Sequence, residues 1–332
     1  MTIRKLSKEE HILTRRLYEE VFPEDSQAFV DYYYTEKTKD NQIYVIEEDG
    51  DIQAMLHLNP YEMYVNGREQ TAHYIVAVAT RAAYRKRGYM GRLLKQALRD
   101  MYEARETFTF LMPAAEAIYL PYDFRTVYEQ KREYYRGTED AQKGVEVYEL
   151  SEGECAGLSE AANGYLKEHC QVFAIRSAAY YERLRKEYAA DGGKLMLYRA
   201  DGHIVDCRPY VPEEEDGHKL IMVRAVDVRR LLMSLSLKSK AAVCFRIADP
   251  VIEENNRCIF LTGTEHSDVA VTDAAEEDSE GTVTISVLSE LVFGACTVEE
   301  ACEKEGVYMS EHMKEEWKKI IPLSDIYINE IV

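Results

Sequence analysis

The sequence predicts a mixed α/β protein built from two or three domains. Its 332 residues exceed the size of most single cores, because one domain usually takes about 100–200 residues. Segments with strand periodicity and segments with helix periodicity alternate along the chain. Apolar residues make up 46% and charged residues 30%, so the composition is that of a chain that folds throughout.

The first segment begins with a strand and two helices. In "IRKLSKEEHILTRRLYEEVF", Ser7 and Glu10 have the spacing of a helix capping box. The hydrophobic residues Ile12, Leu13 and Leu17 are expected to face inward from this helix. A second helix, rich in tyrosine, is expected around "FVDYYYTEKT".

A meander of three antiparallel strands comes next. Residues 43–80 alternate with period two around the turn signals Asp49-Gly50 and Asn66-Gly67. "YMGRLLKQALRDMYEA" then returns to the helical period, and "TFTFLMP" reads as the next strand. A short helix at "AEAIYLPYDF" and a strand that begins at "RTVYEQ" complete a mixed α/β layer.

Two polar, loop-like stretches predict the domain boundaries: "GTEDAQKG" and "PEEEDGHK". The segment between them contains two helical patterns and a hairpin that turns at Asp201-Gly202. Beyond the second stretch come several strands and then three helices. We therefore divide the chain into residues 1–138, 139–215 and 216–332.

The overall charge excludes some partners. A formal net charge of -19 disfavours binding to nucleic acid or to an anionic membrane surface, and it would attract cationic substrates. An acidity that only keeps the protein soluble is the alternative. The sequence has no signal-peptide core and no apolar run of about 20 residues, so we expect a cytoplasmic protein. The seven cysteines lack a CxxC pair, which predicts free thiols, and neither they nor the histidines have metal-site spacing.

The stretch "YRKRGYMGRLLKQAL" carries the clearest functional signal. A strand runs into a basic turn and straight into a helix, whose first backbone N–H groups have no partner within the helix. Such a turn holds an anion such as pyrophosphate through these donors, the helix dipole and the charges of Arg85, Lys86 and Arg87. Gly88 allows the backbone to approach the ligand closely. An ordinary basic surface turn is the alternative.

"VAVATRAAYRKRGYMGRLL" resembles the acetyl-coenzyme A motif of the GNAT N-acetyltransferases, R/Q-x-x-G-x-G/A after a strand and at the start of a helix. Met90 departs from this pattern, because it stands where the family has Gly or Ala. Other segments resemble the Eis-like (enhanced intracellular survival) branch: "VFPED", "AAEAIYLPYDF", "YYERL" with "GGKLMLY", and "IMVRAVDV".

The resemblance implies three parts: an N-terminal GNAT fold with a mixed sheet, a central GNAT-like domain and a C-terminal domain similar to sterol carrier proteins. The central part is too short here for a full GNAT-like domain, so we expect a reduced one. The resemblance also implies an acetyl-CoA-dependent N-acetyltransferase, acting on a primary amine of a small cationic molecule or a peptide, and assembly as a homo-oligomer.

The resemblance assigns roles to residues. Tyr119 matches the general acid that protonates the leaving thiolate, and the α-carboxyl group of Val332 matches the terminal carboxylate that serves as base. Backbone groups near Val78 and Thr80 would bind the pantetheine arm. The residues of the pyrophosphate turn are Arg85, Lys86, Arg87, Gly88, Tyr89, Met90 and Gly91.

The apolar tail "IYINEIV" gives the C-terminus a reason to be anchored rather than frayed. A last strand or helix that simply packs on the core is the alternative for this tail. A buried tyrosine without a catalytic role is the alternative for Tyr119.

For the acceptor amine, acidic and aromatic side chains near the N-terminus read as pocket-lining residues: Glu24, Asp25, Phe29, Tyr32 and Tyr33. A solvated helix face is the alternative for the two acids. Two rival functions stay open. One is a non-catalytic protein with a degenerate GNAT site that binds CoA, an apolar ligand or a partner. The other is an enzyme that uses a longer acyl donor.

Overall fold

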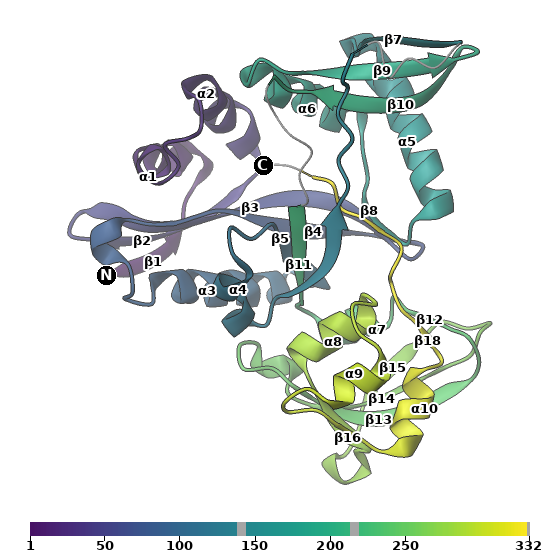
Figure 1. Cartoon of the computed structure of the whole chain (residues 1–332). Coiled ribbons are helices and arrows are strands. Elements are labelled where there is room, and N and C mark those ends of the chain that lie inside the picture. The colour runs from purple at the N-terminus through teal and green to yellow at the C-terminus, as the bar shows by residue number, and fades with distance from the viewer. Residues whose placement is uncertain (138–143, 213–218, 331–332) are drawn as a thin grey trace.

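The computed structural model of the chain describes residues 1–137, 144–212 and 219–330. Its largest sheet crosses the middle of the molecule, with a smaller α/β unit on each side of it (Figure 1). The strand order of the large sheet is β1-β2-β3-β4-β5-β11-β6, and two short strands, β8 and β19, extend it beside β3. Within the described ranges, no helix is long and apolar enough to cross a membrane.

The N-terminal part follows the predicted order of elements. Its elements are β1 (Thr2–Lys5), α1 (Arg15–Val21), α2 (Gln27–Thr35), β2 (Gln42–Glu48), β3 (Asp51–Val65), β4 (Arg68–Thr80), α3 (Tyr89–Glu103), β5 (Phe108–Leu111), α4 (Glu116–Tyr119) and β6 (Arg125–Gln130). The tyrosine-rich helix and the three-stranded meander are confirmed.

Helices cover both faces of the large sheet. Alternate residues of β2 accordingly point into two different hydrophobic cores, one on each face. Tyr44 and Ile46 join the core beneath α3, whereas Ile43 and Val45 join the core beneath α1 and α2. All four side chains are at most 1% exposed. The strand therefore packs against a hydrophobic layer on each face (Figure 1).

The first helical segment differs from its prediction in one respect. The Ser7–Glu10 capping box is present, and Leu17 is buried as expected. Ile12 and Leu13, however, are 52% and 53% exposed, so their predicted inward orientation was wrong. The reason is that Lys8–Thr14 forms a 3-10 helix, whose three-residue turn brings His11 and Thr14 to the inner face instead.

The central part is a small layer of three strands and two helices, in which both helices and the β9–β10 hairpin were predicted and β7 was not. Its sheet has the order β10-β9-β7, and β10 lies at an edge. Helices α5 and α6 pack against each other and against this sheet. The elements are β7 (Val145–Glu149), α5 (Cys155–His169), β8 (Val172–Ala174), α6 (Ala178–Ala190), β9 (Lys194–Ala200) and β10 (His203–Tyr210).

The C-terminal part is a five-stranded sheet, β15-β14-β13-β16-β17, packed with helices. Its elements are α7 (Val228–Leu232), β12 (Ser236–Leu237), β13 (Ala241–Ala248), β14 (Cys258–Gly263), β15 (Ala270–Asp273), β16 (Gly281–Thr284), α8 (Ile285–Val292), α9 (Val298–Cys302), β17 (Tyr308–Met309), α10 (Glu311–Trp317), β18 (Ile320–Ile321) and β19 (Ile326–Tyr327). The predicted strands and helices of this part are confirmed.

One strand departs from the predicted division at residue 216. Strand β11 (Lys219–Ala225) does not belong to the C-terminal sheet, because it pairs antiparallel with both β5 and β6 of the large sheet. The N-terminal sheet is thus completed by a strand that comes after the central part in the sequence. A polar linker marks where the composition changes, but not which sheet the next strand joins.

A buried ion pair fixes β11 to the C-terminal part. Arg224, on β11, donates to Asp249 at 2.6 Å, and neither side chain is exposed to solvent. Arg224 also donates to the carbonyl oxygens of Tyr122 and Ala225, at 3.0 and 2.8 Å. Asp249 accepts two backbone N–H groups as well, those of Val251 and Ile252. The polar groups of both partners are thus compensated inside the core.

We predict that Asp249→Ala lowers the free energy of unfolding by about 3–5 kcal/mol, because it leaves the Arg224 guanidinium buried without a counter-charge. Asp268→Ala is the matched control. The Asp268 side chain is 90% exposed and pairs with Arg68 at the surface, so its loss should cost about 1 kcal/mol or less. Urea denaturation monitored by tryptophan fluorescence measures both. Equal stability of the two variants would contradict the prediction.

Candidate active site

Strand β4 leaves its neighbour β5 near the middle of the sheet. The parallel pairing between them is confined to Tyr74 and Phe110. Beyond that point β4 contains a bulge, in which Ala77 and Val78 lie opposite the single residue Leu56 of β3, and Ala77 has a φ of 47°. A bulge bends a strand and increases its twist. It therefore opens a gap in pairing between the second half of β4 and β5.

The predicted pantetheine-binding residues lie on this diverging half of β4. Val78 and Thr80 are half-buried, and their segment pairs with β3 on one side only. The backbone groups on the other side have lost β5 as a partner. Apart from the Thr80 carbonyl oxygen, which accepts from Arg85, they are available to an extended ligand that takes the place of the missing strand.

The basic turn comes directly after β4 and is open to solvent. All four residues from Arg85 to Gly88 are exposed, and both Lys86 and Gly88 have positive φ, of 62° and 78°. The Arg85 guanidinium donates to the carbonyl oxygen of Thr80 at 3.1 Å, which ties the turn to the end of β4. Arg87 lies 4.6 Å above the ring of Tyr84. The Lys86 ammonium has no partner among the described residues.

Helix α3 begins at this turn with its amide groups uncapped. Gly88 is the N-cap and has no side chain to accept from the first turn, so the N–H groups of Tyr89, Met90 and Gly91 lack intrahelical partners. Met90, the departure from the family pattern, is half-buried against the core. A side chain there leaves its backbone N–H unchanged. Gly91 packs closely against Tyr122, because a Cβ atom at this position would overlap the hydroxyl group of Tyr122 and the tyrosine side chain would have to shift.

Tyr119 ends helix α4 and is positioned by the turn after it. Its ring is 8% exposed and packs edge-on against Phe124, with centroids 6.0 Å apart. Asp123 adopts the left-handed conformation, φ 66°, which reverses the chain between these two residues. The Tyr119 hydroxyl has no hydrogen-bond partner among the described residues. Burial raises the pKa of Tyr119 to about 12, so the phenol keeps its proton at neutral pH.

The C-terminal segment runs back to the large sheet. Strand β19 pairs with β8, and the Gln130 amide donates to the carbonyl oxygens of Ile328 and Glu330 at 2.9 and 3.1 Å. The Glu330 side chain is buried. The segment is therefore anchored as far as Glu330, as the apolar tail predicted. Val332 itself lies outside the described residues.

The predicted acceptor residues do not form one open pocket. Glu24 is exposed in the loop between α1 and α2, and Asp25 accepts a hydrogen bond from Tyr18 at 2.7 Å. Phe29 and Tyr33 are buried in the core beneath α1 and α2, where the Tyr33 hydroxyl contacts Nδ1 of His57 at 2.9 Å. The aromatic spacing of α2 thus reflects packing against the sheet.

Tyr32 instead contacts Glu187, a buried residue that sequence reasoning missed. Its hydroxyl donates to Glu187 of α6 at 2.7 Å, and Lys37 donates to the same carboxylate oxygen at 3.0 Å. Glu187 is 2% exposed, and its other carboxylate oxygen has no hydrogen-bond partner among the described residues. The burial of Tyr61 and the nearby charge of Glu187 help to raise the pKa of Tyr61 well above its usual range. No local signal marks Glu187, because α6 comes from another part of the chain.

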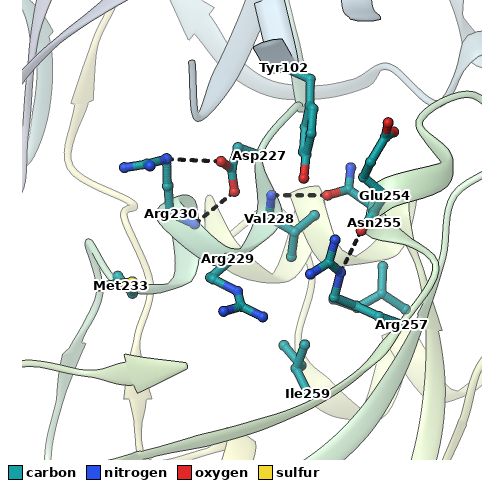
Figure 2. Close-up of a pocket in the computed structure, with 11 residues that line it drawn as sticks. Tyr102, Asp227, Val228, Arg229, Arg230, Met233, Glu254, Asn255, Arg257 and Ile259 are labelled. Atoms are coloured by element: carbon teal, nitrogen blue, oxygen red, sulfur yellow. Dashed lines mark hydrogen bonds and ion pairs between the residues drawn. The ribbon is translucent and has the colours of Figure 1, made fainter. Parts of the chain in front are cut away.

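A separate cavity of about 250 Å³ lies where the C-terminal part meets the end of α3 (Figure 2). Tyr102 forms one wall, and Arg229, Arg230 and Arg257 lie around the opening. These arginines are paired with carboxylates: Arg229 and Arg257 with Asp273, and Arg230 with Asp227. The cavity is at the opposite end of α3 from Gly88, about 20 Å along a 15-residue helix. It is therefore separate from the turn.

The comparisons with known proteins agree with this geometry. Residues 2–127 match a family described as an acetyltransferase (GNAT) domain, and residues 224–328 match a sterol carrier protein domain. No curated protein matches the sequence.

Several solved structures have the same fold over nearly the whole chain. A probable N-acyltransferase from Enterococcus faecalis has a TM-score of 0.77 at 15% identity, with 97% of each chain covered. A GCN5-related N-acetyltransferase from Kribbella flavida has a TM-score of 0.77 at 13% identity, with 100% of each chain covered. Eis1 from Mycobacterium abscessus has a TM-score of 0.68 at 12% identity, with 97% of each chain covered.

The predicted fold class is thus confirmed, with a GNAT fold at the N-terminus and a sterol-carrier-like domain at the C-terminus. The central part, residues 144–212 in the structure, lies between the two matched regions. The chain therefore carries a GNAT acetyltransferase domain over residues 2–127 and a sterol carrier protein domain over residues 224–328, and its overall fold is shared with Eis1 from Mycobacterium abscessus.

Proposed function

We propose that the protein transfers the acetyl group of acetyl-CoA directly to a primary amine of a small cationic molecule or a peptide. The observation that carries this proposal is the continuity from the opening between β4 and β5, through the exposed turn Arg85–Gly88, to the uncapped first turn of α3. An extended strand-like arm fits the opening, and a pyrophosphate fits the turn, so the two halves of coenzyme A match two adjacent features.

Each step of the transfer has a candidate group. The N–H groups of Tyr89, Met90 and Gly91, with Lys86 beside them, would hold the pyrophosphate. Backbone groups at Val78 and Thr80 would hold the pantetheine arm. Tyr119, whose phenol is protonated at neutral pH, would donate its proton to the thiolate as the C–S bond breaks. The carbonyl carbon that loses the sulfur forms its new bond to the amine nitrogen.

The amine must lose a proton before or during attack. We propose that the carboxylate of Val332 accepts it, as the resemblance to Eis-like enzymes implies. Gln130 and Arg132 bind the backbone of Glu330, and this supports the proposal because it holds the chain beside the large sheet up to two residues before Val332. A carboxylate that leaves bulk water has a higher pKa, which makes it a better proton acceptor.

The degenerate, non-catalytic alternative has less support. Lys86 and Gly88 of the turn have positive φ, and the Tyr119 hydroxyl has no hydrogen-bond partner in the described part of the chain. The cavity of the C-terminal part has a volume of only about 250 Å³, and the three arginines beside it are already paired with carboxylates.

We predict that Gly88→Val weakens CoA binding at least tenfold, about 1.4 kcal/mol, because a branched side chain at φ 78° strains the turn and blocks close approach of the pyrophosphate. Gly202→Val is the matched control, since Gly202 has a φ of 80° in the distant β9–β10 hairpin. Titration calorimetry with CoA measures both. Unchanged affinity in a folded Gly88→Val protein would refute the assignment.

We predict that Tyr119→Phe lowers the turnover number by about 10²–10⁴, because the ring and its packing remain while the acidic proton is lost. The affinity for CoA should stay within about twofold of the native value, since the turn is untouched. Tyr308→Phe, at an exposed tyrosine of the C-terminal part, is the control. A near-native turnover number for Tyr119→Phe would mean that another group protonates the thiolate.

We predict that removal of Ile331 and Val332 lowers the turnover number at least tenfold and leaves CoA affinity intact. The turn proposed to bind CoA lies in another part of the fold, whereas the deletion moves the terminal carboxylate back to Glu330 and shortens its reach. Acetyl transfer to a panel of polyamines, aminoglycosides and lysine peptides gives the rates. Native rates in the shortened protein, with its assembly state unchanged, would exclude this carboxylate as the base.

A further inference from the structure

Tyr74 stands where strands β4 and β5 part. It forms the one parallel pair that joins these strands in the described chain, with Phe110 of β5. The two rings stack with centroids 5.1 Å apart and an interplanar angle of 7°, so the tyrosine ring is held in place on one side. Beyond Tyr74 the strands diverge towards Val78 and Thr80. Tyr74 thus marks the closed end of the opening proposed for the pantetheine arm.

The Tyr74 side chain lies on the face of the sheet that α2 covers. Strand pairing places Tyr74 directly opposite Asn59 of β3, and opposite residues of an antiparallel pair point to the same face. His57, two residues before Asn59, shares that face and contacts the Tyr33 hydroxyl of α2 at 2.9 Å. Helix α6 of the central part packs against α2. The Tyr74 ring therefore points towards the side of the sheet where the N-terminal and central parts meet.

The hydroxyl group of Tyr74 is free and reaches open space. It has no hydrogen-bond partner among the described residues. Tyr74 is 2% exposed, and its oxygen is not one of the unpartnered side-chain atoms that are fully enclosed, so the exposed part includes the hydroxyl. The same holds for Tyr119, which is 8% exposed. Two phenol groups thus have unused hydrogen-bonding capacity and contact solvent.

The groups around the Tyr74 hydroxyl come from four other segments. Burial raises the pKa of Tyr74 above its usual range, so the phenol keeps its proton at neutral pH. The charge of Arg132, after β6, lowers this pKa, whereas Glu187 of α6, Tyr119 of α4 and Glu330 of the C-terminal segment raise it further. The hydroxyl therefore lies within electrostatic range of the proposed proton donor, the central part and the C-terminal segment.

Packing alone does not require the Tyr74 hydroxyl. Its stacking partner Phe110 has a plain phenyl ring, and phenylalanine at position 74 would keep the stacked pair. A phenol that is almost buried gives up hydrogen bonds to water and regains none from the described chain, which costs stability. The hydroxyl is therefore a group that a ligand can use and that the fold does not need.

We propose that the Tyr74 hydroxyl binds the acceptor amine and holds its nitrogen beside the acetyl group. This inference rests on the proposed acetyl transfer, and it names an acceptor-binding residue that the family resemblance did not supply. The phenol oxygen accepts an N–H group of the amine, and Tyr74 itself transfers no proton. A primary amine keeps N–H groups for this bond after it has lost one proton. The two phenols thus differ in task, because Tyr119 protonates the thiolate and Tyr74 positions the nucleophile.

Tyr74→Phe tests the proposal, because it removes the hydroxyl and keeps the stacked rings. We expect the KM for the acceptor to rise at least fivefold, the turnover number to stay within about threefold and the affinity for CoA to stay within about twofold. Tyr64→Phe is the matched control, since Tyr64 also stacks on a phenylalanine of the same sheet, Phe173 of β8, with centroids 4.9 Å apart. It should leave all three quantities unchanged.

Steady-state rates at saturating acetyl-CoA, with the panel of polyamines, aminoglycosides and lysine peptides, give the KM and the turnover number. A native KM in a folded Tyr74→Phe protein would overturn the assignment. A lower turnover number with a native KM would overturn it as well, because the hydroxyl would then act in the transition state and not on the bound amine. If the native protein acetylates no amine, the proposed function itself is wrong, and this result is distinct from any effect of the variants.

Discussion

The buried ion pair of Arg224 and Asp249 is the interaction on which the arrangement of the domains depends. It joins a strand of the acetyltransferase sheet to a loop of the sterol-carrier-like domain, and both side chains are fully removed from water. A pair of this kind is stable only while every partner stays in place, because a lone buried charge is far more costly than the pair. Separating the two domains at this point would therefore expose or leave unpaired a charge that is buried in the structure.

The same arginine extends this constraint to the candidate active site. Arg224 donates to the carbonyl oxygen of Tyr122, which stands three residues after Tyr119 in the turn between α4 and β6. The hydroxyl of Tyr122 in turn lies close against Gly91, in the first turn of α3. The turn that follows Tyr119 and the first turn of α3 are thus connected through Tyr122 to Arg224. Arg224 lies at the interface with the C-terminal domain.

Most of the fold could be predicted from the sequence, because the signals that define it are local. Turn residues such as Asp49-Gly50 and the alternation around them specify the meander whatever lies elsewhere in the chain. The candidate coenzyme A turn could be singled out for the same reason, since strand, turn and helix are consecutive, whereas Tyr119 could be named only through the family resemblance. The inward orientation of Ile12 and Leu13 failed because a 3-10 helix has a different period from the α-helix that the pattern suggested.

The acceptor region could not be predicted, because it is assembled from distant segments. Tyr32 and Tyr33 are neighbours on α2, yet one contacts Glu187 of the central part and the other contacts His57 of β3. Nothing near residue 187 in the sequence shows that α6 packs against α2. Long-range placement of this kind depends on how the domains dock, and it emerges only in the folded molecule.

The position of β11 affects the order in which the large sheet can form during translation. Translation delivers β5 and β6 first, and residues 131–218 must be added before β11 can pair between them. At the usual pace of protein synthesis this takes roughly 4–20 s, during which two strand edges of the sheet have no neighbour. Unpaired edges of this kind invite association with other nascent chains. The protein therefore has an interval on the ribosome in which its first domain is vulnerable, and a chaperone that shields sheet edges would be needed then rather than after release.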